Sequence, residues 1–410
     1  MLRGYRVLDL TDEKGLLCGA ILGDMGADVI KVERPGGDPC RSLGSFYHDV
    51  PHPEQSLFWF AYNTNKRGIT LSLETADGRE LFKKLARTAD IVIESYRPGY
   101  LDGLGLGYEE LRGVNPRLVL TSITAFGQTG PYKDLLAYDL QAQAMSGVVS
   151  MCGWPGEAPL AWSGFQAYLQ ASVHAAVGTT TALYHREVNG ESQHVDVSIR
   201  DAALWLTAPT PWAIRWRELG VDAERLGARV RFFGPAQRNI FPCKDGFINW
   251  RVWVGQLGRG MGHLIEWMEE EGLAGDLKEA GDWTRMDVTQ ITQEQIEHWE
   301  SIFAAFFVKH TKRELQERAA RSNGILFPVS TMADALDNPQ LEAREYFVEV
   351  EHPEIDATLK YPGAPFRSSQ APDHVKRRAP FIGEHNEEIY VGELGLTRED
   401  LLVLKQGHII

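Results

Sequence analysis

The sequence has few cysteines and no spacing that would pair them. The 410-residue chain contains four, Cys18, Cys40, Cys152 and Cys243, and none forms a C-x-x-C pair. Disulfide frameworks and structural zinc sites both need several cysteine or histidine ligands at characteristic spacings. We therefore predict neither a disulfide framework nor a metal site, and the composition favours the reducing cytoplasm.

Long apolar runs and an excess of basic residues are also absent. No stretch approaches the roughly 18 apolar residues that span a bilayer. The start, MLRGYRVLDLT, runs directly into a strand-like segment without the apolar core of a signal peptide. The formal charge is −14, which argues against a broad surface for nucleic acid or anionic membrane. We expect a soluble protein that holds any anionic ligand with a few local cations.

A third absence concerns carboxylates. Residues 158–186 contain no Asp and no Glu, although the chain has 56 acidic residues. The segment is rich in alanine and other small residues and runs into TTTALYHRE at 179–187, which predicts a closely packed helix over about 160–185. No side chain in this helix can serve as a carboxylate nucleophile.

What is present is an alternation of strands and helices. Between the strand-like runs lie stretches with helical spacing, as in 77–86. Apolar strands between helices predict a parallel sheet covered on both faces, with ligand sites at its carboxyl ends. The first turn, TDEKGLLCG, lacks G-x-G-x-x-G, so dinucleotide binding is not predicted. The strand-like runs are 5–10, 27–32, 89–94, 118–123 and 194–199.

The chain is long enough for two domains. We predict an α/β fold with a large Rossmann-like domain over 1–200, completed by 380–410, and a small domain over 226–325. A linker over 201–225 and a return linker over 326–379 would join them. Connections this long are unusual inside one compact domain and suggest a chain that wraps a partner.

Candidate functional residues lie near the predicted strand ends. Five of them are basic: Arg34, Arg41, Lys66, Arg67 and Arg97. Each alone is typical of a solvated surface charge, yet together they could bind a polyanion such as the phosphates of coenzyme A (CoA). His174, Asp139 and Glu157 are candidate general bases. For these three, packing, capping and turn roles are the alternatives, and the sequence leaves both open.

Seven segments in the same order resemble the class III CoA-transferase family, also called the carnitine-dehydratase and bile-acid-inducible group. The resemblance implies interlocked chains, each a ring made of a large domain, a small domain and two linkers, which assemble as a dimer. The segments are RVLDLT at 6–11, GDMGADVIKVERPGGDPCR at 23–41, NKRGITLSL at 65–73, ADIVIESYRPGYLDGLGLGYEEL at 89–111, NPRLVLTSITAFGQTGPY at 115–132, TALYHRE at 181–187 and FIGEHNEEI at 381–389.

The resemblance also implies a binding site for CoA, which is a substrate in this family and not a tightly bound cofactor. Two positions depart from relatives: Gly103 stands where some carry a basic residue, and Asp12-Glu13-Lys14 replaces smaller neutral residues. The residues that the resemblance assigns to CoA are Lys14, Gly15, Arg34, Leu71, Ser72, Leu73, Glu74, Ser95, Tyr96, Arg97, Gly103, Leu136, Ala137, Tyr138 and Asp139.

In active members of the family an aspartate attacks the acyl thioester to form an anhydride, which the released thiolate reopens. Counting back from TALYHRE, this position falls on Tyr168, and neither Tyr168 nor the nearby Gln166 and Gln170 can form such an anhydride. The resemblance thus implies no catalytic residue of this kind in the chain.

Two explanations follow. The chain is either the non-nucleophilic subunit of a heterodimer or heterotetramer, whose paralogous partner supplies the aspartate, or it performs different chemistry on acyl-CoA. FQAYLQA, in place of the aspartate region, favours the first and resembles heteromeric members that move CoA from succinyl-CoA to an aromatic acid such as benzylsuccinate. The rivals are an acyl-CoA racemase or isomerase using His174, and a non-catalytic acyl-CoA-binding protein.

Overall fold

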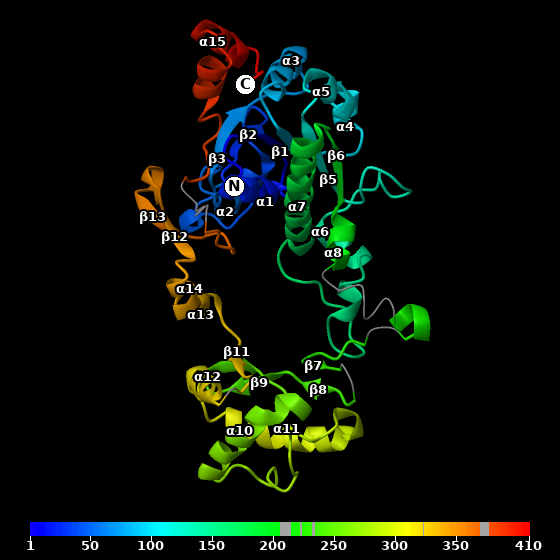
Figure 1. The fold of residues 1–410 in the computed structure, drawn as a ribbon. Helices are drawn as coiled ribbons and strands as arrows, with labels where there is room; N and C mark the ends of the chain where they lie inside the picture. The colour runs from blue at the N-terminus through cyan, green and yellow to red at the C-terminus, as the bar shows by residue number, and fades with distance from the viewer. Residues whose placement is uncertain (206–214, 222–223, 232–233, 323, 370–376) are drawn as a thin grey trace. The chain divides into compact units, whose positions relative to one another are not determined.

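The computed structural model describes residues 1–205, 215–221, 224–231, 234–322, 324–369 and 377–410 (Figure 1). Parts of both predicted linkers, at 206–214, 222–223 and 370–376, lie outside the described residues, as do 232–233 and 323 in the predicted small domain. The chain forms two compact units. The first comprises 1–150, 161–222 and 342–410, and the second comprises 151–160 and 223–341.

The first unit is built on a six-stranded sheet in the order β3-β2-β1-β4-β5-β6, and every pairing is parallel. The chain order reverses between β1 and β4, where ligands bind in doubly wound sheets. The predicted α/β fold with a parallel sheet is confirmed. The strands are β1 (Arg6–Leu10), β2 (Asp28–Glu33), β3 (Lys66–Thr70), β4 (Ile91–Glu94), β5 (Val119–Thr124) and β6 (His194–Ser198).

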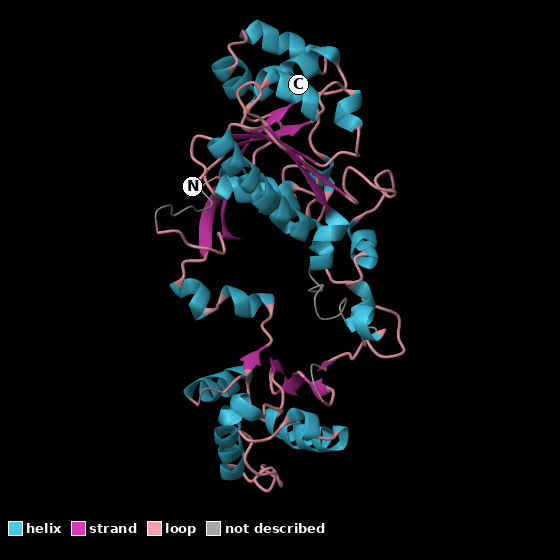
Figure 2. Ribbon diagram, turned by 45° about the vertical axis from the view of Figure 1, so that its right-hand side comes forward, coloured by secondary structure: helices cyan, strands magenta, loops and turns pink. Residues whose placement is uncertain are grey.

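Helices cover both faces of this sheet (Figure 2), because successive strand residues point to opposite sides. Leu8 and Leu10 of β1 belong to one core with α3, α5 and α15, whereas Val7 belongs to the other with α1, α7 and α8. The helices of this unit are α1 (Leu16–Asp24), α2 (Leu57–Tyr62), α3 (Ala76–Ala86), α4 (Tyr100–Gly103), α5 (Tyr108–Val114), α6 (Asp139–Met145), α7 (Gln166–Asn189), α8 (Ile199–Leu204) and α15 (Arg398–Gln406).

A hairpin and a π-helix complete the first unit. The hairpin pairs β12 (Phe347–His352) with β13 (Ala357–Pro362) in antiparallel fashion. Its Val350 and Tyr361 pack with Trp59 and Phe60 of α2 in a separate small core. The π-helix, Glu387–Glu393, buries Ile389 and Tyr390 in the core of α3 and α15.

The second unit has its own core, rich in tryptophan and phenylalanine, between a three-stranded sheet and helices. The sheet order is β11-β10-β9, and both pairings are antiparallel. The elements are β7 (Arg229–Val230), β8 (Gln237–Arg238), β9 (Ile240–Cys243), β10 (Gly246–Asn249), β11 (Phe327–Pro328), α10 (Arg259–Glu270), α11 (Gln293–Phe307), α12 (Lys312–Arg321) and α13 (Met332–Leu336), followed at the boundary by α14 (Pro339–Ala343).

Candidate functional site

The carboxyl ends of β1, β2, β3 and β4 surround a cavity of about 370 Å³. It lies beside the reversal of strand order, where a doubly wound sheet offers its binding crevice. Seven residues that the sequence assigns to CoA line it: Arg34, Leu71, Ser72, Leu73, Glu74, Ser95 and Tyr96. The other lining residues are Leu10, Asp12, Val32, Glu33, Asp38, Pro39 and Tyr100.

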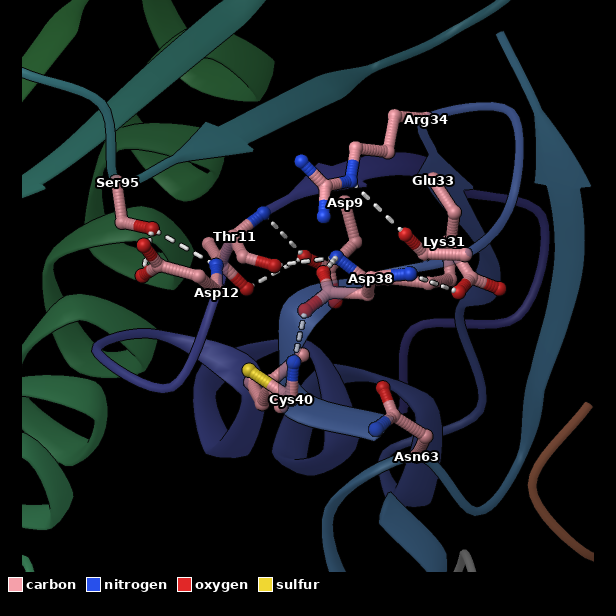
Figure 3. Close-up of polar contacts among 12 residues, drawn as sticks. Asp9, Thr11, Asp12, Lys31, Glu33, Arg34, Asp38, Cys40, Asn63 and Ser95 are labelled. Atoms are coloured by element: carbon pink, nitrogen blue, oxygen red, sulfur yellow. Dashed lines mark hydrogen bonds and ion pairs between the residues drawn. The ribbon is translucent and has the colours of Figure 1, made fainter. Parts of the chain in front are cut away.

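Buried ion pairs support the strand ends around this cavity (Figure 3). Lys31 Nζ lies 3.1 Å from Asp38 Oδ2, and both side chains are almost fully buried. Burial alone would lower the pKa of Lys31, but the neighbouring carboxylates, Asp38 first, raise it above its usual range. Lys31 also donates a hydrogen bond to the carbonyl of Thr11. The ammonium group thus ties β2 to the turn after β1 and to the loop beyond β2.

Three cations expected at the CoA site are structural instead. Arg41 donates two hydrogen bonds to Glu33, at 2.6 and 2.7 Å, and Lys66 donates to Asp9 at 2.8 Å. Arg67 pairs with Asp28 and with carboxylates of the π-helix. All three are buried, so the prediction that they bind a polyanion is wrong. Arg41 lies in the short helix after β2, Lys66 and Arg67 begin β3, and carboxylates neutralise all three.

Arg34 and Arg97 are the expected cations that remain exposed. Arg34 Nε donates to the carbonyl of Gly37 at 3.2 Å (Figure 3), and the Arg34 side chain lines the cavity. Within the described ranges no carboxylate forms an ion pair with either arginine. By contrast, Lys14 pairs with Asp12, as Lys31 does with Asp38. Of these two arginines, Arg34 lines the cavity, whereas Arg97 lies next to the lining residue Tyr96 and does not line it itself.

The turn after β1 is held from the end of β4. Asp12 N donates to Ser95 Oγ at 2.9 Å, and Ser95 Oγ donates back to Asp12 Oδ1 at 2.7 Å (Figure 3). Gly15 immediately precedes the next helix, α1, and a Cβ atom at this position would lie 2.6 Å from Thr11 Cγ2. The predicted residues Lys14 and Gly15 therefore shape this turn but do not line the cavity.

Two tyrosines form one wall of the cavity. The rings of Tyr96 and Tyr100 lie 4.6 Å apart between centroids and are inclined by 33°. The Tyr100 hydroxyl donates to Glu74. Burial first, and then Glu74, raises the pKa of Tyr100 to about 12, so the hydroxyl stays neutral.

Other predicted residues lie away from the cavity. Gly103 ends α4 with open space around it, and Leu136 and Tyr138 are exposed before α6. Asp139 begins α6 and is buried. None of residues 136–139 lines the cavity.

Two candidate bases also lie elsewhere. His174 shares a hydrogen bond of 3.0 Å with the carbonyl of Gln170 on its own helix and lines a different cavity beside Trp205 and Asp196. Glu157 lies exposed in the loop 151–160, which belongs to the second unit.

Tyr168 lies in the first turn of α7, two residues after Gln166, and only 2% of its surface is exposed. Its N–H donates to Asp139 Oδ1 at 2.9 Å, and its ring stacks on Phe165 at 5.8 Å. Burial raises the pKa of the Tyr168 phenol, as do the charges of Glu13, Asp12 and Asp139. The hydroxyl is therefore neutral.

Comparisons with known proteins decide the family. The sequence matches the model of the family described as CoA-transferase family III over residues 2–386. The chain belongs to this family. It is 37% identical over 395 residues to subunit BbsE of succinyl-CoA:(R)-benzylsuccinate CoA-transferase from Thauera aromatica, covering 94% of this chain and 93% of that subunit.

Two further relatives agree. This family III chain is 32% identical to succinyl-CoA–D-citramalate CoA-transferase from Chloroflexus aurantiacus, over 97% of the chain and 94% of the relative. A crystal structure of a CAIB/BAIF family protein from Brucella suis superposes with a TM-score of 0.80 at 27% identity, over 95% of this chain and 98% of that one. The predicted resemblance is confirmed, and the enzyme class is CoA-transferase.

Neither a metal-binding cluster nor a membrane-spanning helix lies in the described ranges. No group of three or more His, Cys, Asp and Glu side chains there is placed to hold a metal ion. In the same part of the family III chain, no helix is long and apolar enough to cross a membrane.

Sequence reasoning missed Glu94, the last residue of β4. Its carboxyl group is 4% exposed and accepts a hydrogen bond from Tyr96 N at 2.7 Å. Burial raises the pKa of Glu94 to about 7, although hydrogen bonds from Ser122 and Tyr96 act in the opposite direction. A Glu beside the SYRPG segment was a visible signal, but only the structure reveals its burial.

This raised pKa predicts a pH-dependent stability. Between the ordinary pKa of 4.5 and about 7, folded Glu94 binds more protons than the unfolded chain, so the free energy of unfolding falls as pH rises. Between pH 4.5 and 8 we expect the free energy of unfolding to fall by about 2–3 kcal/mol less in Glu94→Gln than in the unaltered protein. Chemical denaturation of both proteins at the two pH values measures the difference. An unchanged pH dependence in the variant would contradict the assignment.

Proposed function

We propose that this chain is the non-nucleophilic subunit of a heteromeric class III CoA-transferase. CoA, as a substrate and not as a resident cofactor, would occupy the cavity at the strand ends. A paralogous chain would supply the catalytic aspartate. The observation that carries this proposal is the combination of a cavity with two unpaired arginines nearby and a buried, neutral Tyr168 where the family resemblance places the nucleophile.

The cavity suits the nucleotide part of CoA. Arginine guanidinium groups bind phosphate oxygens in bidentate geometry, and Arg34 and Arg97 offer such groups after β2 and β4. The Tyr96 and Tyr100 rings offer an aromatic wall on which an adenine ring can stack. Three of the acids at the cavity have cationic partners, in the pairs Asp38–Lys31, Asp12–Lys14 and Glu33–Arg41, so these three repel the phosphates less.

Arg34→Gln is expected to weaken CoA binding by about tenfold to a hundredfold, because a charge-assisted hydrogen bond contributes about 1.5–3 kcal/mol. Arg112→Gln is the matched control, since Arg112 is exposed on α5, pairs with Glu109 and does not line the cavity. Isothermal titration of both variants with CoA tests the assignment. Equal affinities of the two variants for CoA would show that Arg34 does not bind CoA.

A partner chain is supported by the free face of α7. One face of this helix packs alanines against the sheet, whereas Val173, Val177, Tyr184 and Val188 are exposed. Trp205, just beyond α8, is exposed as well. Large apolar side chains gathered on one face mark an interaction surface. We propose that the partner covers this face, with the two chains interlocked as rings through linkers around 201–225 and 326–379.

Val177→Glu is expected to break this assembly, because it places a carboxylate at the middle of an apolar interface. Val177 is 59% exposed in the single chain, so the substitution leaves the fold of that chain intact. Val403→Glu is the control, since Val403 is equally exposed on α15. Sedimentation velocity should show dissociation for the first variant alone. An intact complex with Val177→Glu would place the partner elsewhere.

For the reaction itself we propose transfer of CoA from succinyl-CoA to an aromatic acid such as benzylsuccinate, the substrate pair in the name of the Thauera aromatica relative. The test expresses the chain alone and together with its paralogue and measures formation of the acyl-CoA product. We expect transfer only from the pair. Transfer by the chain alone would refute the assigned role, and exchange of the α-proton of an acyl-CoA by the chain alone would indicate a racemase.

A further inference from the structure

The second unit contains a cavity of about 400 Å³ that the proposed CoA chemistry does not use. Its walls come from α10 and α12, together with the segments that follow β10 and α12. All of its lining residues lie within 250–326, and none belongs to the cavity at the strand ends of the large sheet. A volume of this size is typical of small-molecule sites in proteins.

The interior of this cavity is aromatic and apolar. Trp250, Trp253 and Trp267 line it, together with Met261 and Leu264. The indole N–H of Trp253 donates to the carbonyl of Ile325 at 3.1 Å, and that of Trp267 donates to Glu271 at 2.6 Å. Because these two donors are already satisfied, the tryptophans offer a ligand only apolar ring surface. One face of each ring is covered, by Arg251 at Trp253 and by Arg318 at Trp267. Apolar ring surfaces favour a flat aromatic ring.

Charged and titratable side chains also line the cavity: two arginines, two glutamates and one histidine. Arg318 forms an ion pair with Glu270, at 2.5 Å, and lies over the Trp267 ring. His263 lies 3.3 Å from Glu266. Arg321 ends α12, and in the described part of the chain no carboxylate pairs with it. A guanidinium group beside an apolar cavity selects ligands that carry a carboxylate.

We infer that this cavity binds an aromatic carboxylate, with its ring among the tryptophans and its carboxylate on Arg321. The site is separate from the proposed CoA site and does not depend on a nucleophile in this chain. It gives the second unit a ligand-binding role of its own, so an aromatic acid can be held by the subunit that lacks the family's aspartate.

The test uses the full chain in its assembled state and 2-naphthoate as the probe, with 2-naphthamide as the uncharged analogue. Saturation-transfer NMR and titration of tryptophan fluorescence measure binding. We expect Arg321→Gln to weaken binding of 2-naphthoate by about tenfold to a hundredfold and to leave 2-naphthamide unaffected. Arg313→Gln, on the exposed face of the same helix and paired with Glu317, is the matched control and should change neither affinity.

A second variant tests the cavity itself. Leu264→Trp fills it and should abolish binding of both probes, whereas affinity for CoA stays unchanged because Leu264 lies in the other unit. Thermal melting checks that the variant is folded, and Arg321→Gln decides the matter if it is not. The inference is overturned if naphthoate does not bind at millimolar concentration, if excess CoA displaces it, or if Arg321→Gln has no more effect than Arg313→Gln.

Discussion

Lys66→Met is expected to lower the free energy of unfolding by about 3–5 kcal/mol, because it leaves a buried charge without its partner. Lys66 and Asp9 are both 0% exposed, and Lys66 Nζ donates to Asp9 Oδ2 at 2.8 Å, to the Leu16 carbonyl at 2.8 Å and to Asn63 Oδ1 at 2.9 Å. Methionine preserves the apolar stem but none of these bonds. Urea denaturation measures the change.

Two controls separate the pair from the bulk of the side chain. The double variant Asp9→Asn/Lys66→Met removes the uncompensated charge and keeps an acceptor for Thr11, so it should recover at least about half of the lost stability. Lys83→Met, on the surface of α3 and paired with Glu80, should cost less than about 1 kcal/mol. A loss as small for Lys66→Met as for Lys83→Met would show that the buried pair does not support the strand ends.

Tyr168→Asp places a carboxylate at the position that we propose for the family's nucleophile, but it is expected to yield no working nucleophile. The new carboxylate would be buried in the first turn of α7, near the charges of Asp12, Glu13 and Asp139. Loss of the packed ring and repulsion among the acids should lower the free energy of unfolding by at least about 3 kcal/mol at neutral pH. Transfer by the variant alone should stay at least about a thousandfold below that of the mixed complex.

Tyr168→Phe is the matched control for this position. Phenylalanine keeps the ring that stacks on Phe165 and removes only a neutral hydroxyl. The mixed complex containing Tyr168→Phe should therefore transfer CoA at the unaltered rate, as measured by formation of acyl-CoA. A rate for Tyr168→Asp alone that matched the mixed complex would instead show that the surrounding shell of this chain is already competent.

The sequence predicts the parallel sheet because its strands are nearly continuous apolar runs. β3 is the strand that this rule misses, since Lys66-Arg67-Gly68 resembles a charged loop. Both cations are buried there and form ion pairs with carboxylates that are distant in sequence, Lys66 with Asp9 and Arg67 with Asp28. Local composition cannot show such pairing, and for the same reason Lys66 and Arg67 were expected in the anion site.

The candidate site is predictable where it follows from strand ends. Arg34, Ser72, Ser95 and Tyr96 come together because they follow three strands of one parallel sheet, β2, β3 and β4. Burial and pairing decide the rest. The raised pKa of Glu94, for example, depends on desolvation that no spacing indicates.

Native mass spectrometry of the complex purified from the cells that produce it tests the central proposal most directly. We predict a mixed complex that contains a second chain of similar length, with an aspartate at the position that corresponds to Tyr168 in this chain. A complex made only of this chain that nevertheless transferred CoA from succinyl-CoA would contradict the proposal, because the acyl group would then be carried without the family's nucleophile.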